Sequence, residues 1–282
     1  MSGGAPAIRQ VRSDADLVRC ADIAGAIEPV SPTVEQLREV QGRLLLHDGG
    51  GYAYVNTSSV AGSAYAMVRV LPARRRRGIG SALVEAAAAA ARELGTASAW
   101  GYVLPGDDDS LRFASTRGFR EVGRDVELRR RLVSGEGTMP PDVVELGPEL
   151  LEDAYRVAVA AVPDMVTAGA ARVREFAEWA EDLRSATVAF VALHAGAVVG
   201  YATLHPCADA ARLEHGFTGV LPEHRRRGFA TALGRAQIAW AAAHGYEELV
   251  TTTGVTNTAL RRQKAKLGYV ELDGPVLVRG PV

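Results

Sequence analysis

The strongest constraint on the fold is an internal repeat, in which the same residues recur 150 positions further along the chain. The repeated segments include Val70-Leu71-Pro72 with Val220-Leu221-Pro222, Arg75-Arg76-Arg77-Gly78 with Arg225-Arg226-Arg227-Gly228, Gly95 with Gly245, and Gly118 with Gly268. The spacing is constant, and a period of this length is too long for a solenoid. The repeat therefore predicts two copies of one domain.

Length and composition fit this division. The chain has 282 residues, of which 48% are hydrophobic, so two small domains can each bury a core. Residues 132–148 are rich in glycine and proline, which is typical of a linker. We predict an N-terminal domain over residues 1–133, a linker with a first strand over residues 134–147, and a C-terminal domain over residues 148–282.

Hydrophobic periodicity predicts helices and strands in the same order in both copies. In the second copy we expect helices at 149–162, 172–183, 231–244 and 258–267, and strands at 143–146, 187–193, 197–205, 212–221, 248–252 and from 269. In the first copy we expect helices at 13–25, 33–42 and 81–94, and strands at 44–47, 52–56 and 64–71. Alternating helices and strands of this kind predict an α/β fold.

Charge and cysteine content exclude several classes of protein. The formal net charge is −1, which argues against a dedicated nucleic-acid-binding protein. The two cysteines, Cys20 and Cys207, form no disulfide framework, and a reducing cytoplasmic location fits. The N-terminus lacks the pattern of a signal peptide, and the most apolar helical stretch is too short to span a bilayer. We expect a cytoplasmic protein without a membrane or nucleic-acid partner.

In each copy a strand leads into a proline, a cluster of arginines and a glycine turn before a long helix. The helix N-terminus offers unpaired N–H groups and a positive dipole end, and glycine lets the backbone approach a phosphate closely. Arginines add charge-assisted hydrogen bonds. A solvated basic turn is the alternative interpretation, but two occurrences in register favour a phosphate site. The Rossmann and Walker A patterns are both absent.

The loops Arg75-Arg76-Arg77-Gly78-Ile79-Gly80 and Arg225-Arg226-Arg227-Gly228-Phe229-Ala230 resemble the Gln/Arg-x-x-Gly-x-Gly/Ala signature of the GNAT superfamily of N-acetyltransferases. A later motif of that superfamily, a helix running into Leu-Gly-Phe/Tyr, is similar to Lys266-Leu267-Gly268-Tyr269 and to Thr116-Arg117-Gly118-Phe119. The resemblance covers nearly the whole chain, as in tandem members such as mycothiol synthase. It implies two tandem GNAT-type domains, each a mixed, mostly antiparallel sheet flanked by helices.

The resemblance further implies direct transfer of an acetyl group from acetyl-CoA, the cosubstrate, to the amine of a small-molecule acceptor. In the second copy it places pantetheine on the strand before the loop, the pyrophosphate on the loop, and an oxyanion-binding N–H near Thr218. The implied cofactor-binding residues are Val220, Leu221, Arg225, Arg226, Arg227, Gly228, Phe229, Ala230, Thr231 and Asn257, and in the first copy Val70, Leu71, Arg75, Arg76, Arg77, Gly78, Ile79, Gly80 and Ser81.

Glu214 is the candidate general base, because several members of the superfamily carry a glutamate eleven residues ahead of the first loop residue. By the period of two along a strand, we expect Glu214 to share a face with Thr218 and Val220. A cross-strand salt bridge is the alternative role. The first copy has Ala64 at this position and Asp107 in place of Asn257, and an acid there should repel a phosphorylated cofactor. We therefore predict that the second copy is catalytic.

The general acid is not identified. Many members have a tyrosine four residues before the final glycine, where this chain has Ala114 and Lys264. Tyr201 and Tyr269 are available elsewhere, and the thiolate can also leave without an acid. His205 and His215 are alternative acids or bases on the substrate side. With Cys207 and Glu214 they lack a recognised metal-ligand spacing, so we predict no metal site.

Two other functions stay open. The chain could be a non-catalytic acyl-CoA-binding or sensing protein, which would bind CoA without turnover. It could also acetylate protein lysines or N-termini, which would call for an acidic docking groove. We expect a monomer or a homodimer.

Overall fold

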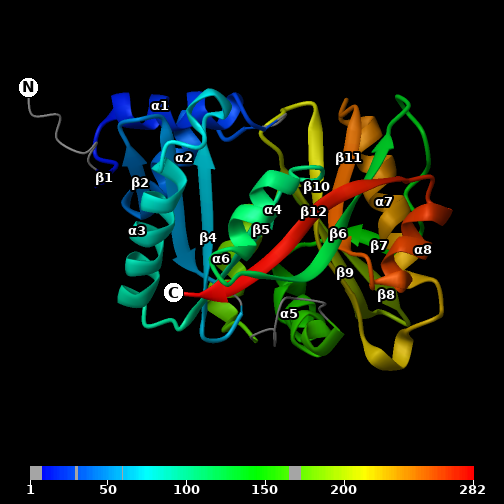
Figure 1. Ribbon diagram of the computed structural model, residues 1–282. Coiled ribbons are helices and arrows are strands. Elements are labelled where there is room, and N and C mark those ends of the chain that lie inside the picture. The colour runs from blue at the N-terminus through cyan, green and yellow to red at the C-terminus, as the bar shows by residue number, and fades with distance from the viewer. Residues whose placement is uncertain (1–7, 29–30, 59, 165–172) are drawn as a thin grey trace, which may run out of the picture. The chain divides into compact units, whose positions relative to one another are not determined.

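The computed structural model describes residues 8–28, 31–58, 60–164 and 173–282 of the chain (Figure 1). It divides into two compact units, which we call the N-unit (residues 1–123 and 275–282) and the C-unit (residues 124–274). This division differs from the predicted boundary near residue 133. The end of the chain, Val276–Pro281, pairs with a strand of the N-unit, and residues 125–131 pair with a strand of the C-unit. The sheet of the N-unit is thus completed by residues that we predicted for the C-terminal domain, and the sheet of the C-unit by residues that we predicted for the N-terminal domain.

The N-unit has helices on both faces of a mixed sheet. Its strands run in the order β1-β2-β3-β4-β5-β12, antiparallel except for the parallel pair β4–β5. The last of these, β12 (Val270–Pro281), belongs to this unit from Pro275 onwards. The elements are β1 (Ile8–Gln10), α1 (Asp14–Gly25), α2 (Val34–Glu39), η1 (Gln41–Arg43), β2 (Leu44–His47), β3 (Gly51–Thr57), β4 (Ser63–Val70), η2 (Pro72–Arg74), α3 (Ile79–Glu93), β5 (Ser98–Val103), α4 (Asp108–Ser115) and the start of β6 (Arg120–Arg131).

Alternation along β3 and β4 builds two cores in the N-unit. Ala53 and Val55 of β3 pack with Ala64 of β4 against α3. The other face carries Tyr52, which packs with α1 and α2. Both helices begin at the capping residues that the sequence offers, Ser13 for α1 and Thr33 in a capping box for α2. The two faces of this sheet are therefore chemically distinct, which matters for the site below.

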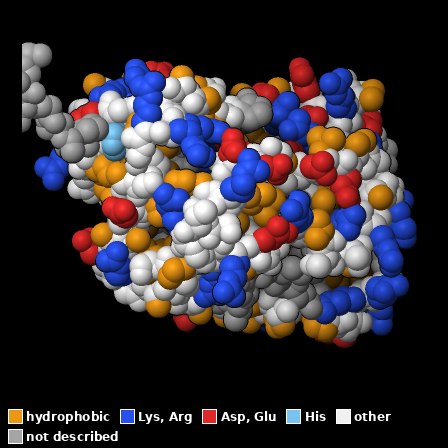
Figure 2. Space-filling model, viewed as in Figure 1, with side chains coloured by type: hydrophobic (Ala, Val, Ile, Leu, Met, Phe, Trp, Pro, Cys, Tyr) orange, Lys and Arg blue, Asp and Glu red, His pale blue; other side chains and the backbone are white. Residues whose placement is uncertain are grey.

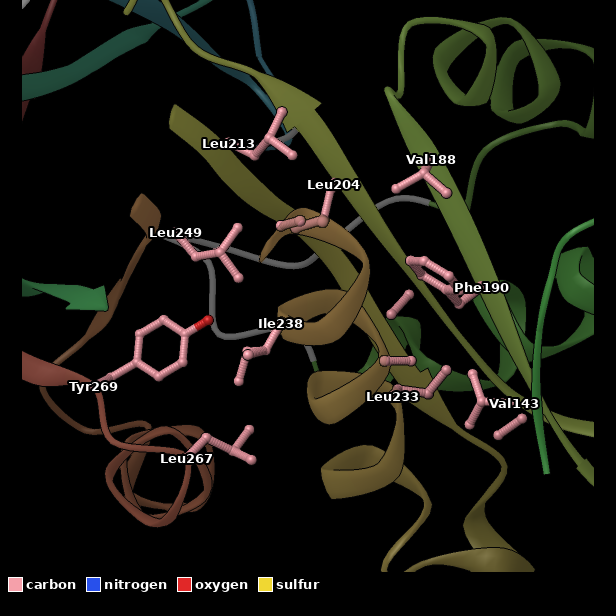
Figure 3. Packing of buried hydrophobic residues seen from close by; sticks show 14 of the residues in the cluster. Val143, Val188, Phe190, Leu204, Leu213, Leu233, Ile238, Leu249, Leu267 and Tyr269 are labelled. Atoms are coloured by element: carbon pink, nitrogen blue, oxygen red, sulfur yellow. The ribbon is translucent and has the colours of Figure 1, made fainter. Parts of the chain in front are cut away.

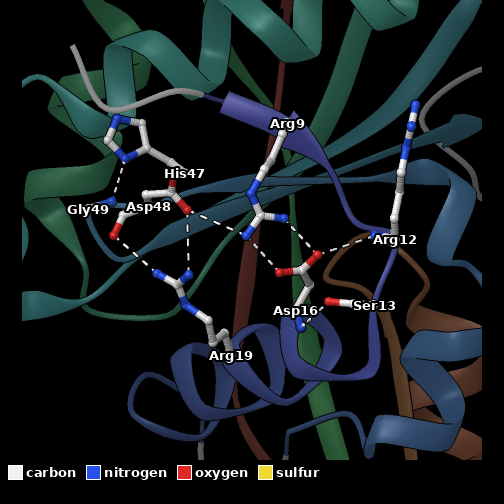
Figure 4. Close-up of polar contacts among 8 residues, drawn as sticks. All are labelled: Arg9, Arg12, Ser13, Asp16, Arg19, His47, Asp48 and Gly49. Atoms are coloured by element: carbon white, nitrogen blue, oxygen red, sulfur yellow. Dashed lines mark hydrogen bonds and ion pairs between the residues drawn. The ribbon is translucent and has the colours of Figure 1, made fainter. Parts of the chain in front are cut away.

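A network of ion pairs ties the start of the N-unit to α1 (Figure 4). The guanidinium of Arg9 donates two hydrogen bonds, of 2.6 and 2.7 Å, to the carboxylate of Asp16. Arg9 and Arg19 also contact Asp48, at 3.5 and 3.4 Å. The hydrogen bonds from Arg9 hold the pKa of the buried Asp16 well below its usual range.

The C-unit repeats this architecture. Its strands run in the order β6-β11-β10-β9-β8-β7, with β10–β11 as the parallel pair. The elements are β7 (Val143–Glu145), η3 (Pro148–Leu150), α5 (Leu151–Ala161), η4 (Val162–Asp164), α6 (Phe176–Arg184), β8 (Val188–His194), β9 (Ala197–Pro206), β10 (Arg212–Val220), η5 (Pro222–His224), α7 (Phe229–Ala243), β11 (Glu248–Gly254), α8 (Thr258–Lys266) and β12 (Val270–Pro281).

Most of the predicted elements are present, with shifts at their ends. The helices predicted from 81 and 231 begin two residues earlier, because Gly78 and Gly228 serve as their N-caps. The helix predicted from 172 begins at Phe176, and Arg172 lies outside the described residues. The last strand begins at Val270 instead of Tyr269.

The main core of the C-unit lies between its sheet and α7 (Figure 3). Phe190 and Leu204 from the sheet meet Leu233 and Ile238 from α7, and Leu267 closes the cluster from the end of α8. The opposite face is covered by α5 and by Trp179 of α6. In the part of the chain that the structure describes, no helix combines the length and apolarity needed to cross a membrane.

Candidate functional site

Both arginine loops fold in the same way. The second arginine of each cluster, Arg76 or Arg226, adopts a left-handed φ of 62°, which is uncommon outside glycine and often marks functional loops. Gly78 (φ 84°) and Gly228 (φ 95°) then cap α3 and α7 without a capping side chain. The first N–H groups of each helix are thus left to bind an anion.

In both units the parallel strands separate beside this loop. The register of β4 with β5 ends at Tyr65 and Trp100, and that of β10 with β11 ends at Glu214 and Val250. Beyond these points the strands diverge, while β4 stays paired with β3 as far as Val70. Among the described residues no strand pairs with the inner edge of β4 beyond Tyr65, so the sheet is open next to the helix N-terminus.

In the N-unit this opening is part of a cavity of about 770 Å³. Its lining includes the predicted residues Val70, Arg75, Arg76, Gly78, Gly80 and Ser81. Three other predicted residues lie elsewhere: Ile79 is buried against the sheet, Leu71 packs on the α1 face, and Arg77 does not line the cavity. The cavity has the size of an ordinary ligand site and joins the anion-binding loop to the gap between the strands.

Two arginines that the sequence reasoning missed also line this cavity. Arg117 lies over the ring of Phe113 at 3.6 Å and donates a hydrogen bond to the hydroxyl of Ser81. Arg112 lines the same wall and pairs with Asp109. Arg112 lies in α4 and Arg117 follows the helix in the motif Thr116-Arg117-Gly118-Phe119, so attention to the basic residue of that motif could have found Arg117. Together with the loop they provide positive charge for a polyanionic ligand.

On the face of the protein that Figure 2 shows, positive charge is not gathered in one patch. Over the face in Figure 2, Lys and Arg side chains (blue) are interspersed with Asp and Glu side chains (red). This agrees with the net charge of −1. The loop and its cavity therefore offer local selection of an anion.

Several of the same positions in the C-unit carry larger side chains. Four of the small residues that line the cavity of the N-unit have bulkier, buried counterparts 150 residues later, whereas the lining residues Ala66, Arg69 and Val84 correspond to glycines. The pairs are Ala87 and Gln237, Ala88 and Ile238, Gly101 and Thr251, and Ala114 and Lys264. In addition α8 packs directly on α7, since a Cβ on Gly234 would lie 2.5 Å from Leu267. The larger side chains and the close packing of α8 on α7 fill part of the space that corresponds to the cavity.

The C-unit contains a buried polar cluster around Lys264, one of these larger side chains. The Nζ of Lys264 lies 4.7 Å from the centre of the Tyr269 ring, and only 2% of the residue is exposed. Burial lowers the pKa of Lys264 to about 7. The hydroxyl of Tyr269 is 2.5 Å from Nε2 of His215, whose pKa burial and the nearby Lys264 both lower. The sequence reasoning had no signal for this cluster beyond the lysine in place of tyrosine.

The predicted face of Glu214 is wrong. The register of β10 with β9 pairs His215 with Leu204 but Thr218 with Ala202, so β10 contains one extra residue. This β-bulge reverses the alternation, and Thr218 lies on the face of His215, opposite to that of Glu214. Partial burial, and then the charge of Glu127, raise the pKa of Glu214. No bulge interrupts the pairing of β3 with β4 in the N-unit.

The repulsion argued for Asp107 is also weakened by the structure. Asp107 caps α4 by accepting hydrogen bonds from the N–H and hydroxyl of Ser110, at 3.0 and 2.8 Å, and lies 3.4 Å from Arg75. Burial alone would raise the pKa of Asp107, but these contacts lower it. Asn257 caps α8 in the same way, through the N–H of Leu260. Both residues thus have a structural role, and the charge of Asp107 is already compensated.

The other candidate residues on the strands of the C-unit have separate hydrogen-bond partners. His205 contacts the hydroxyl of Thr203 at 3.0 Å, and burial lowers the pKa of His205. The hydroxyl of Tyr201 accepts a hydrogen bond from Trp179, and burial raises the pKa of Tyr201 to about 12. Within the described ranges, no three His, Cys, Asp or Glu side chains form a group that could hold a metal ion.

Comparison with known proteins gives consistent results. The sequence profile of the acetyltransferase (GNAT) family matches residues 42–119 and again residues 150–269. A GCN5-related N-acetyltransferase from Sphaerobacter thermophilus has a similar structure, with a TM-score of 0.76 at 20% identity over 98% of this chain and 95% of that one. A tandem GNAT protein from the clavulanic acid biosynthesis pathway has a TM-score of 0.75 at 19% identity, covering 97% of both chains. No functionally curated protein matches the chain.

Proposed function

Because the chain belongs to the acetyltransferase (GNAT) family, we propose that it transfers an acetyl group from acetyl-CoA to the amine of a small-molecule acceptor, and that the N-unit holds the acetyl-CoA. The observation that carries this proposal is the cavity of about 770 Å³ that joins the arginine loop to the opening between β4 and β5. Two binding requirements of acetyl-CoA, a site for phosphates and a channel for an extended arm, meet in this one cavity.

Different residues of the N-unit would bind different parts of acetyl-CoA. The N–H groups at the start of α3, with Arg75 and Arg76, would bind the pyrophosphate. The unpaired inner edge of β4 would bind the amides of pantetheine as a neighbouring strand does. Arg117, which borders the same cavity, would bind a further phosphate of the CoA. The thioester then lies where the strands part, near Ala66 and Gly101.

Transfer at this point is a direct substitution at the thioester carbon. The amine nitrogen forms a bond to the carbonyl carbon, and the carbon–sulfur bond breaks with its electron pair on sulfur. The proton that the nitrogen loses balances the thiolate, so the products are an N-acetyl amide and free CoA. An N–H of the unpaired β4 edge would stabilise the negative charge on the carbonyl oxygen in the transition state. Holding both reactants in the opening lowers the entropic barrier.

A second candidate places the reaction in the C-unit, as the sequence analysis predicts. The raised pKa of Glu214 favours it, because a carboxylate of higher pKa is a better general base near neutral pH. Against it stand the large buried side chains at the cavity positions of the C-unit. We therefore rank the N-unit first, and the roles of Glu214, Thr218 and the C-unit loop stay predictions.

Two matched variants separate the candidates. Ala114→Lys gives the N-unit the residue that its counterpart carries at position 264, and Glu214→Gln removes the candidate base of the C-unit. The assay measures release of the CoA thiol from acetyl-CoA in the presence of a panel of primary amines. We expect Ala114→Lys to lower the rate at least about tenfold, because the side chain enters the pantetheine channel, and Glu214→Gln to change it less than about twofold.

The reverse result would move the reaction to the C-unit. Retained binding of acetyl-CoA without turnover for any amine would instead favour the non-catalytic acyl-CoA-binding function. Thermal unfolding of each variant checks that the fold is intact. Turnover with a lysine-containing peptide but not with small amines would favour acetylation of proteins.

A further inference from the structure

The cavity of the N-unit passes from one face of the sheet to the other. Its lining includes Val68 and Val70, which face α3, and also Met67 and Arg69, which alternate with them and face α1. Ile27, at the end of α1, borders the same cavity. If the proposed function holds and acetyl-CoA enters from the loop beside α3, the acceptor approaches the thioester from the α1 face.

Aromatic side chains gather on that face, at the point where β4 and β5 separate. Tyr65 pairs with Trp100 in the last register position, so both lie on the same face, and Tyr102 follows two residues later. Ring centres are 5.0 Å apart for Tyr65 and Trp100, 5.3 Å for Trp100 and Tyr102, and 6.2 Å for Tyr65 and Tyr102. Tyr54 extends the cluster, 5.9 Å from Tyr65. We call Tyr65, Trp100 and Tyr102 the aromatic cluster.

The aromatic cluster is not core packing. Its three residues are half-buried and belong to none of the buried hydrophobic groups among the described residues, whereas α1 and α2 cover Tyr54 and Met67. Tyr102 lines the cavity itself. The indole N–H of Trp100 is buried and makes no hydrogen bond with any described residue, so a donor is left unused at this place. Half-buried rings with an unused donor are typical of a binding surface.

A charged group lies next to the cluster. Arg69, which lines the cavity, pairs through Nε with Oε1 of Glu28, and both side chains are largely buried. Within the described part of the chain the second oxygen, Oε2, has no hydrogen bond. Burial raises the pKa of Tyr65, and the charges of Arg69 and Glu28 are near enough to shift it in opposite directions. Glu28 can therefore accept a further hydrogen bond within reach of the rings.

From this arrangement we propose that the acceptor is a primary amine carried on an aromatic body, which the aromatic cluster binds on the α1 face of the N-unit. The inference rests on the proposed function and names its substrate class. The rings provide flat apolar contact and attract an ammonium group by cation–π interaction. The free oxygen of Glu28 accepts a hydrogen bond from the ammonium and directs the nitrogen towards the opening between the strands. The ammonium then releases one proton to solvent, and the neutral amine attacks the thioester.

The test compares two primary amines that share a two-carbon arm, 2-phenylethylamine and ethanolamine, with the full-length protein and acetyl-CoA. Thiol release gives kcat and KM for each. Burying a phenyl ring should favour 2-phenylethylamine in kcat/KM by about 30-fold. Trp100→Ala should raise the KM for 2-phenylethylamine about tenfold, change that for ethanolamine by less than about twofold, and be largely rescued by Trp100→Phe. Glu28→Gln should raise the KM for both amines. Tyr155→Ala, an aromatic change in the C-unit, is the control and should alter neither.

The other outcomes distinguish failure of the aromatic acceptor from failure of the proposed function. Equal or better use of ethanolamine, or an equal effect of Trp100→Ala on both amines, refutes the aromatic acceptor but leaves the acetyltransferase function standing. Calorimetric binding of acetyl-CoA without acetylation of 2-phenylethylamine also refutes it. Failure to bind acetyl-CoA at all would instead refute the proposed function itself. Thermal unfolding of Trp100→Ala and Trp100→Phe shows whether a loss reflects the fold.

Discussion

Replacing Gly101 by alanine tests how closely β4 and β5 approach each other at the point where they begin to separate. Gly101 lies in β5, one residue beyond the last pair with β4, where a Cβ would lie 2.2 Å from the carbonyl oxygen of Ala66. No real Cβ contact is that short, and the partner is backbone, which cannot rotate away. One of the two strands must therefore move by about 1 Å, and overpacking of this kind costs about 3 kcal/mol, the upper part of the usual range.

The assay is thermal unfolding followed by calorimetry. At this chain size a loss of 1 kcal/mol lowers the unfolding midpoint by about 2–4 °C, so Gly101→Ala should lower it by about 6–12 °C. It should also weaken binding of acetyl-CoA, since the strands that border the cavity shift. Gly42→Ala is the matched control, because a Cβ there meets nothing within 4 Å and the φ of Gly42 is not left-handed.

A Gly101→Ala protein as stable as the wild type would refute this reasoning, since it would mean that β4 and β5 are not held at the spacing described. The C-unit provides the natural contrast. It carries Thr251 at the corresponding position and accommodates it beside a strand with a β-bulge between His215 and Thr218. We therefore expect that Thr251→Gly relieves no strain. Instead it should destabilise the C-unit, because the buried contacts of the threonine side chain are lost.

Three further predictions concern charge and capping. Because the pKa of Lys264 is lowered to about 7, the folded C-unit binds fewer protons than the unfolded chain between about pH 7 and 10.5, and stability rises with pH across this window. Lys264→Met should remove this slope and raise the unfolding midpoint most at pH 6. Thermal unfolding from pH 6 to 9.5 measures both effects. Because the pKa of Asp16 is lowered in the folded state, its carboxylate stabilises the N-unit at neutral pH, and this contribution is lost as the pH falls below about 4. Asp16→Asn should therefore flatten the pH dependence of the urea unfolding midpoint between pH 3 and 7. Asp107→Ala should cost about 1 kcal/mol as a lost helix cap, whereas Asp107→Asn should keep most of the stability and change acetyl-CoA affinity less than about threefold.

The repeat made the fold predictable. Once the two arginine loops were placed in register, the strand before each loop and the helix after it followed from periodicity and from the glycines that end α3 and α7. The exchange of last strands was not predictable, because local patterns do not tell which sheet edge a terminal strand joins. Pairing of Val276–Pro281 with β5 is decided by tertiary contacts over most of the length of the chain.

The site was only partly predictable, for two physical reasons. The β-bulge in β10 has no sequence signature of its own, and it broke the alternation on which the placement of Glu214 depended. The difference between the two units at these positions depends on the volumes of a few residues, such as Ala114 and Lys264, which the sequence comparison considered for acid chemistry only. Comparing side-chain size between the repeats would have shown the larger residues of the C-unit at four of the cavity positions.

The account depends most directly on which unit binds acetyl-CoA, and calorimetric titration measures this. The matched variants are Arg76→Glu and Arg226→Glu, which reverse one charge at the same left-handed position of each loop. We predict one site per chain in the wild type, lost in Arg76→Glu and retained in Arg226→Glu. A site lost in Arg226→Glu and retained in Arg76→Glu would contradict the account and place the cofactor in the C-unit.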